Sequence, residues 1–213
     1  MNIDGLKFNW LSLLPKSKDN QLLGNQVFAT LIQAYSAAGR YYHNLNHVQY
    51  LLDLSESIKE FSERLSVIQL SAWFHDYIYD SQAQDNEARS AIYAEATLHQ
   101  LNFAPETIES VKQIILSTQN HQPLLDSIDN LIFLDLDLAI LGSESSNYLK
   151  YAQAIRKEYC WLSDRDYCQG RIRVLTNFLT RNRIYFTDYF SQKFEQTARE
   201  NLITEIKLYS GTI

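Results

Sequence analysis

The sequence predicts an all-α fold, arranged as a single-domain helical bundle over residues 1–213. The first observation is composition: six glycines, three prolines and 46% hydrophobic residues favour a compact domain with few sharp turns. The second is that apolar residues recur at helical spacing along most of the chain. The third is that no internal repeat and no Ser- or Gly-rich linker divides it. Helices packed on helices are the architecture that satisfies such a pattern.

The first two predicted helices lie on either side of a short polar connector. Helical spacing appears over 22–38, and Gly39 is placed to end that helix. Asn44 or Asn46 can cap the next helix, which is expected to run to about Phe61. The connector therefore delivers the chain directly into the second helix.

Three more helices are expected before residue 120. The third covers about 65–79, and the fourth runs over 86–101 behind Asp85 as its cap. Pro105 opens the fifth, which extends to about Ser117, at a position where a missing N–H costs nothing. A polar loop separates the fifth helix from the next apolar segment.

The apolar residues of segment 126–141 fit both the two-residue period of a strand and the 3.6-residue period of a helix. As a strand it would place Asp135 and Asp137 on one face, whereas on a helix the two carboxylates would lie about 200° apart. We favour a helix, because sixteen residues is long for a strand and nothing nearby would pair with it. The remaining helices are expected at about 147–161, 166–181 and 188–209.

Charge and cysteine content exclude several classes of partner. The formal net charge is −6, which argues against a nucleic-acid polymer, and no basic cluster suggests a membrane surface. No apolar run approaches about 20 residues, and the N-terminus does not have the pattern of a signal peptide. Cys160 and Cys168 lack a CxxC pattern and are expected as reduced thiols in a cytoplasmic protein. The oligomeric state stays open, a homodimer included.

A histidine and a carboxylate stand side by side inside an aromatic, apolar run, 72–80. A buried ionisable pair such as His75 and Asp76 is costly unless a charge or a hydrogen bond offsets it. A metal ion is an economical partner for a neutral imidazole next to a carboxylate. His47 in 42–48 and the Asp135/Asp137 pair in 132–138 add to this signal, because the order His, His-Asp, Asp along helices is what a shared site would need.

We expect His47, His75, Asp76 and Asp137 to bind one divalent ion, held by three helices as in other helical metal sites. Two imidazoles and two carboxylates suit Mn²⁺, Fe²⁺, Ni²⁺, Co²⁺ or Zn²⁺, and Mg²⁺ stays open as well. His43 is the rival of His47, being four residues away on the same face. The alternative to Asp137 is Asp135, and whichever does not bind metal should bond backbone or a basic residue.

Several motifs together resemble those of one family. They are Arg40-Tyr-Tyr-His-Asn-Leu-Asn-His47, Ala72-Trp-Phe-His-Asp-Tyr-Ile-Tyr-Asp80, Asp85-Asn-Glu87, Thr118-Gln-Asn-His121, Leu134-Asp-Leu-Asp-Leu-Ala-Ile-Leu-Gly142, Ile155-Arg-Lys-Glu-Tyr159 and Gly170-Arg171. With these motifs the chain resembles the HD superfamily of metal-dependent phosphohydrolases. The resemblance implies an all-helical HD-type domain over 1–213, with a metal-site core at about 40–142 and C-terminal helices, 147–209, packed on it. It also implies metal binding by the four residues above.

Candidate catalytic groups flank the metal ligands in sequence. Asp76 serves as a ligand and a catalytic residue, and Glu87 is placed to orient a water or act as general base. The alternative for Glu87 is a carboxylate that the helix dipole favours in a first turn. His121 is a candidate contact to phosphate or an acid for the leaving group, with an ordinary loop histidine as the alternative.

Three arginines, Arg40, Arg156 and Arg171, are the candidates for binding phosphate, because a guanidinium can grip a phosphoryl group through two hydrogen bonds. For Arg156 an internal salt bridge with Glu158 is the alternative. The expected ligand is a small phosphorylated compound, with nucleotides among the candidates.

Three functions follow from these residues. The favoured one is a metal-dependent phosphohydrolase that cleaves a phosphomonoester or phosphoanhydride with a metal-activated water. The alternative is a helical module that binds metal and nucleotide without turnover. A third is a phosphatase of the haloacid dehalogenase type with Asp135 as nucleophile, which would need an α/β chain.

Overall fold

The computed structural model describes residues 2–211, which form ten α-helices and two short 3-10 helices with no β-strand among them. The prediction of an all-α fold is confirmed. The backbone divides into two compact units, residues 1–134 and 135–213, and helix α7 crosses the division. That residues 1–213 act as one domain stays a prediction. No described helix is long and apolar enough to cross a membrane, and Cys160 and Cys168 are free thiols.

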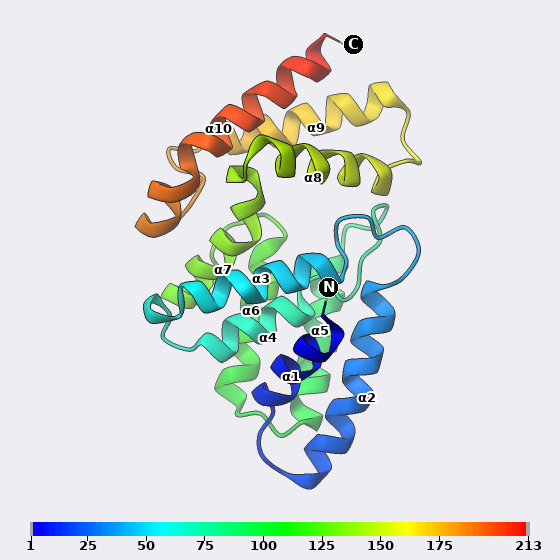
Figure 1. Ribbon diagram of the computed structural model, residues 1–213, viewed down its shortest axis with the longest axis vertical. Helices are drawn as coiled ribbons and strands as arrows, with labels where there is room; N and C mark the ends of the chain where they lie inside the picture. The colour runs from blue at the N-terminus through cyan, green and yellow to red at the C-terminus, as the bar shows by residue number, and fades with distance from the viewer. Residues whose placement is uncertain (1, 212–213) are drawn as a thin grey trace. The chain divides into compact units, whose positions relative to one another are not determined.

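Helix α4 forms the centre of the first unit. The elements of this unit are α1 (Ile3–Leu13), α2 (Lys18–Tyr35), α3 (Leu45–Ser57), η1 (Lys59–Phe61), α4 (Leu65–Phe74), α5 (Asn86–Gln100), α6 (Pro105–Thr118) and the start of α7 (Ile128–Leu138). Every residue of α4 from Val67 to Phe74 is buried, and the helix packs against α3, α5 and α6 (Figure 1). A helix that is buried on all sides and mostly apolar belongs in a core, and its buried Gln69 and Ser71 have hydrogen-bond partners.

Helix α4 ends at Phe74 instead of continuing to Tyr79 as the periodicity predicts, so this predicted boundary is wrong. The Ser90 hydroxyl accepts a hydrogen bond from the amide of Ile78 and donates one to its carbonyl. These backbone groups are therefore engaged by a side chain of α5 and not by the next helical turn. The chain turns out of the helix at His75, which places the His-Asp pair at a helix end.

Helix α1 comes before the first predicted helix and was not predicted from the sequence. Its N-cap is Asn2, whose side chain accepts from the Gly5 amide, and its buried residues Leu6 and Trp10 lie four apart on one face. The Trp10 indole donates to the Gly24 carbonyl on α2 at 2.8 Å. A short helix with one such pair gives only a weak periodic signal.

The second unit contains the end of α7, then η2 (Ala139–Gly142), α8 (Ser145–Glu158), α9 (Asp164–Leu179) and α10 (Asp188–Ser210), drawn from green to red in Figure 1. The segment 126–141 is helical, as favoured over a strand. Helix α10 packs against η2 and α9. The contact with η2 is close at Gly142, where an added Cβ would lie 2.7 Å from the Phe194 carbonyl oxygen.

Two glycine substitutions in the second unit should have opposite effects on stability. Gly142→Ala should lower the free energy of unfolding by about 1–3 kcal/mol, because the backbone of α10 must move to admit the methyl group. Gly170→Ala in α9 meets no heavy atom closer than 3.9 Å and should raise it by about 0.5–1 kcal/mol. Urea unfolding of both variants measures this, and equal effects would contradict the close packing at Gly142.

Candidate metal centre

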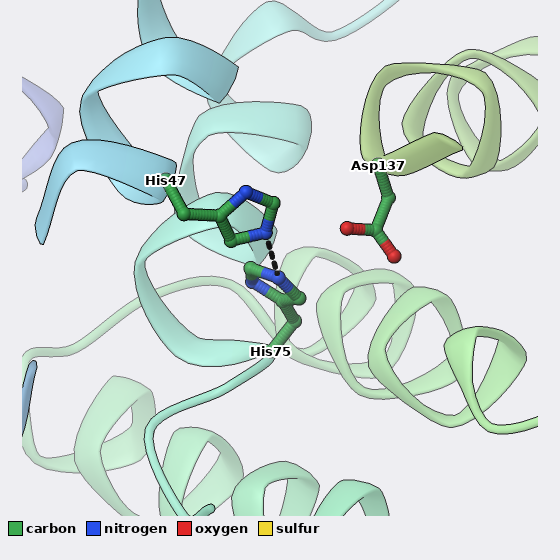
Figure 2. Close-up of side chains that lie close together, drawn as sticks. All are labelled: His47, His75 and Asp137. Carbon is green, nitrogen blue, oxygen red and sulfur yellow. Dashed lines mark hydrogen bonds between the residues drawn. The ribbon is translucent and has the colours of Figure 1, made fainter. Parts of the chain in front are cut away.

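Two buried imidazoles meet at the centre of the candidate site. Asn44 caps α3 by accepting from the Asn46 amide, which places His47 in the first turn, and His75 follows the last residue of α4. Their Nε2 atoms lie 3.1 Å apart, and the two residues are 3% and 1% exposed. Figure 2 shows the rings directed at each other through these nitrogens.

The tautomer of His75 follows from its second ring nitrogen. Its Nδ1 lies 3.2 Å from the carbonyl oxygen of Ala72, and a carbonyl can only accept, so Nδ1 carries the proton. Nε2 of the neutral ring then presents its lone pair toward His47. Fixing a ligand histidine through its other nitrogen in this way is typical of protein metal sites.

Asp76 lies against the same two nitrogens. One carboxylate oxygen, Oδ2, is 2.9 Å from Nε2 of His75 and 3.7 Å from Nε2 of His47. Burial by itself raises the pKa of Asp76, but the neighbouring imidazoles of His75, His43 and His47 outweigh burial and bring the pKa well below its usual range. Asp76 is therefore an ionised carboxylate beside two imidazoles.

Asp137 faces the imidazoles from helix α7. Phe133 on α7 makes an edge-on contact with the ring of His75, with centroids 5.5 Å apart. Because α7 continues without a break to Leu138, Asp137 lies one turn beyond Phe133 on the same face. Ligand atoms of His47, His75 and Asp137 all lie within 4.8 Å of one another, and the carboxylate extends toward the two rings in Figure 2. The structure thus groups these three as predicted.

This donor set fits a divalent ion. Two ligands at about 2.1 Å from a metal and about 90° apart are separated by about 3 Å, and the Nε2 atoms lie 3.1 Å apart. The distance from His75 to Asp76 is in the same range, 2.9 Å. Nitrogen and carboxylate oxygen together suit ions of borderline hardness. The group of His47, His75 and Asp137 could hold a metal ion. Ligation by Asp76 and the identity of the ion stay predictions.

The neighbouring carboxylate, Asp135, has a different set of partners. It accepts hydrogen bonds from the amides of Phe186 and Thr187 at 2.7 and 2.8 Å and from the Thr187 hydroxyl at 2.7 Å. Burial raises the pKa of Asp135 to about 6, against these hydrogen bonds, which lower it. Asp135 therefore bonds backbone, as predicted for the carboxylate of this pair that does not bind metal.

Arg40 connects the two segments that carry the ligands. Its guanidinium donates to the carbonyls of His43, Asp76 and Tyr77 at 3.1, 2.7 and 2.7 Å. It also lies over the ring of Tyr79. The side chain thus holds the approach to α3 against the turn after His75. Contact of Arg40 with phosphate stays a prediction.

Helix α5 positions a further carboxylate near this turn. Asn86 bonds both the amide and the carbonyl of Asp80, and Ser90 bonds Ile78, so the start of α5 is fixed to the segment after the ligands. Glu87 lies between Asn86 and Ser90 in the first turn of α5 and is half-buried. Within residues 2–211 its carboxylate has no hydrogen bond or ion pair. Sequence reasoning missed Ser90, which carries no signal beyond being a small polar residue on an apolar face.

His121 lies in a loop with an unusual backbone. Its φ of 47° is in the left-handed region, which a residue other than glycine adopts at a cost. Its loop contacts the one before α5, because the Gln119 amide donates to the Gln84 carbonyl at 3.2 Å. The structure thus brings the loops that precede Glu87 and contain His121 together, while their catalytic roles stay predictions.

The other two arginines lie in the second unit and have internal partners. Arg156 donates to the carbonyls of Tyr159 and Leu162 and pairs with Asp164 at 2.7 Å, not with Glu158 as considered from the sequence. Arg171 is buried and forms an ion pair with Glu205. Phosphate binding by either arginine stays a prediction.

Comparison of the chain with protein-family models, with curated proteins and with solved structures finds no match.

Matched substitutions should separate the roles of the two α7 carboxylates. Asp137→Asn should remove bound metal while changing the free energy of unfolding of the metal-free protein by less than about 1 kcal/mol, because its side chain is half-buried. Asp135→Asn should cost about 1–3 kcal/mol, since an amide cannot accept from all three donors, and should leave the metal content of the folded protein unchanged. Elemental mass spectrometry and urea unfolding test this pair, and the reverse pattern would exchange the two assignments.

Proposed function

We propose that the protein is a metal-dependent phosphohydrolase of the HD superfamily, acting on a phosphomonoester or phosphoanhydride of a small, nucleotide-like compound. The observation that carries the proposal is the approach of two buried Nε2 atoms to 3.1 Å with the Asp76 carboxylate beside both. Two imidazole nitrogens and a carboxylate oxygen that converge in a site with little solvent are a donor set that a divalent cation would satisfy.

The proposed metal is held by His47, His75, Asp76 and Asp137. When bound, it would supply a water of lowered pKa and polarise a phosphoryl oxygen. The motifs that resemble those of the HD superfamily support this use of the site over other metal chemistry. Glu87, half-buried in the first turn of α5, is the further carboxylate that the proposal assigns to catalysis.

The remaining roles fall to residues around the ligands. Glu87 is the proposed general base, which takes a proton from the attacking water onto a carboxylate oxygen. His121 is the proposed acid, which gives a proton to the leaving oxygen. Arg40 is proposed mainly to position the ligands, because its guanidinium donates to three backbone carbonyls in the segments that carry them.

The test is metal content and turnover of untagged protein. The wild type should retain about one divalent ion per chain and hydrolyse at least one member of a panel of phosphomonoesters and nucleotides, and chelation should abolish turnover. Asp76→Asn should lose metal and turnover, while Glu87→Gln should keep the metal and lose about 10²-fold or more in kcat.

The control for general damage is Asp80→Asn, a carboxylate of the same loop outside the proposed set of ligands. It should keep both metal and activity. Full turnover by metal-stripped wild type, or no metal uptake from Mn²⁺, Ni²⁺ or Zn²⁺ solutions, would refute the proposal.

A module that binds metal and nucleotide without turnover is the second candidate. The observation in its favour is that Arg40, Arg156 and Arg171 all bond protein carbonyls or carboxylates, which leaves less positive charge to stabilise a transition state. A nucleotide that raises the melting temperature of the metal-loaded protein while the whole panel stays uncleaved would favour this module.

A further inference from the structure

A buried carboxylate outside the proposed set of ligands lies in the first turn of α7. Asp129 is 1% exposed, and its Oδ1 and Oδ2 accept hydrogen bonds from the amides of Glu63 at 2.9 Å and Arg64 at 3.0 Å. The Arg64 guanidinium lies 3.9 Å away on a side chain that is 41% exposed, so water screens much of its charge. Burying a carboxylate is costly unless hydrogen bonds offset the cost, so the two amides are its main partners.

The two amides belong to the start of α4. Arg64 precedes Leu65, the first residue of this helix, and its own side chain makes no capping hydrogen bond. Amides at the start of a helix lack partners within it, and the helix dipole gives that end a partial positive charge. Asp129 supplies both an acceptor and a negative charge, so it caps α4 from a position 65 residues further along the chain.

A second contact joins α7 to the other end of α4. Phe133 is fully buried one turn beyond Asp129 on the same face, and its ring makes the edge-on contact with His75, the residue that follows α4. Contacts at both ends of α4 fix the position and the direction of α7, because a rod held at two points cannot pivot about either. Asp137 lies one further turn along this face, with its carboxylate directed at the imidazoles of His47 and His75 (Figure 2).

We propose that Asp129 is a positioning residue of the metal centre, which holds the start of α7 on α4 so that Phe133 and Asp137 face His75. Its hydrogen bonds go to the start of α4, so it acts through the helix that carries Asp137 and not by binding the ion itself. A less constrained α7 would present Asp137 to the imidazoles for less of the time, which lowers the apparent metal affinity. This inference rests on the proposed metal site but not on the proposed hydrolysis.

The affinity of the untagged full chain for Zn²⁺, measured by competition with a chelating dye, tests the proposal. Asp129→Ala should weaken Zn²⁺ binding by about tenfold or more, as is typical when a contact that orients the ligands is lost. Asp129→Asn keeps an oxygen that can accept from Glu63 but has an amide group in place of the second acceptor, so it should weaken binding by about threefold. Wild-type affinity in either variant would overturn the proposal, and Asp129→Asn gives this answer even if Asp129→Ala does not fold.

Asn20→Ala is the matched control for a general loss of stability. Asn20 is 2% exposed in the same unit, and its side chain donates to the carbonyls of Pro15 and Leu101 at 2.9 Å each, at the opposite end of α5 from Asn86. The variant also removes two hydrogen bonds between a buried side chain and the backbone, so it should lower the urea midpoint of the metal-free protein as Asp129→Ala does. Its Zn²⁺ affinity should change less than about twofold. Equal losses of affinity in the two variants would overturn the proposal, because general destabilisation would then be the cause.

Metal affinity also separates this proposal from the proposed function. A wild type that binds Zn²⁺ but cleaves no phosphoester would refute the hydrolase, while weakened binding by Asp129→Ala would still support the positioning role. A wild type that binds Zn²⁺ and cleaves phosphoesters, with full Zn²⁺ affinity in both Asp129 variants, would overturn the positioning role alone. Absence of Zn²⁺ binding by the wild type would overturn both.

Discussion

The close approach of two buried imidazole nitrogens is the constraint around which the N-terminal unit is organised. Ring nitrogens 3.1 Å apart, beside an ionised carboxylate, cannot rely on solvent to keep them in place. The chain holds them with backbone contacts: the Ala72 carbonyl orients one ring, and the cap at Asn44 sets the helix that carries the other. Arg40 then fastens the two segments together through carbonyl groups.

The helical periodicity of α7 directs the side chains of Asp135 and Asp137 to different partners. Asp135 and Asp137 are about 200° apart around the helix axis, so they cannot serve the same site. One accepts three hydrogen bonds from the segment before α10, and the other lies near the imidazoles. A conservative change at either position should therefore have an unrelated consequence, although the two residues are almost adjacent in sequence.

Much of this arrangement could be predicted from the sequence, for identifiable reasons. Apolar periodicity is strong in α3, α5, α6 and α10, and each of these helices lies within a few residues of its predicted bounds. The end of α4 could not be predicted, because it depends on Ser90, a partner twelve residues further along the chain that has no periodic signature. Helix α1 was missed because only Leu6 and Trp10 mark its buried face.

The candidate site, too, could be predicted from the sequence only in part. The residue types of His47, His75 and Asp137 and their order along successive helices predicted their grouping, since buried polar side chains need partners. The arginines show the limit of this reasoning. A guanidinium suits a phosphate and a backbone carbonyl equally well, and only the folded structure shows that Arg40 bonds three carbonyls and Arg171 a carboxylate.

The Arg40 bridge also bears on the order in which the protein is made. It joins residues only 36 and 37 positions apart, a loop that closes at modest entropic cost. Because synthesis proceeds from the N-terminus and compact parts of a chain can fold as they emerge, the two imidazoles and Asp76 can be assembled while α7 is still unmade. Asp137, the third member of the cluster, is then added only when α7 has been synthesised.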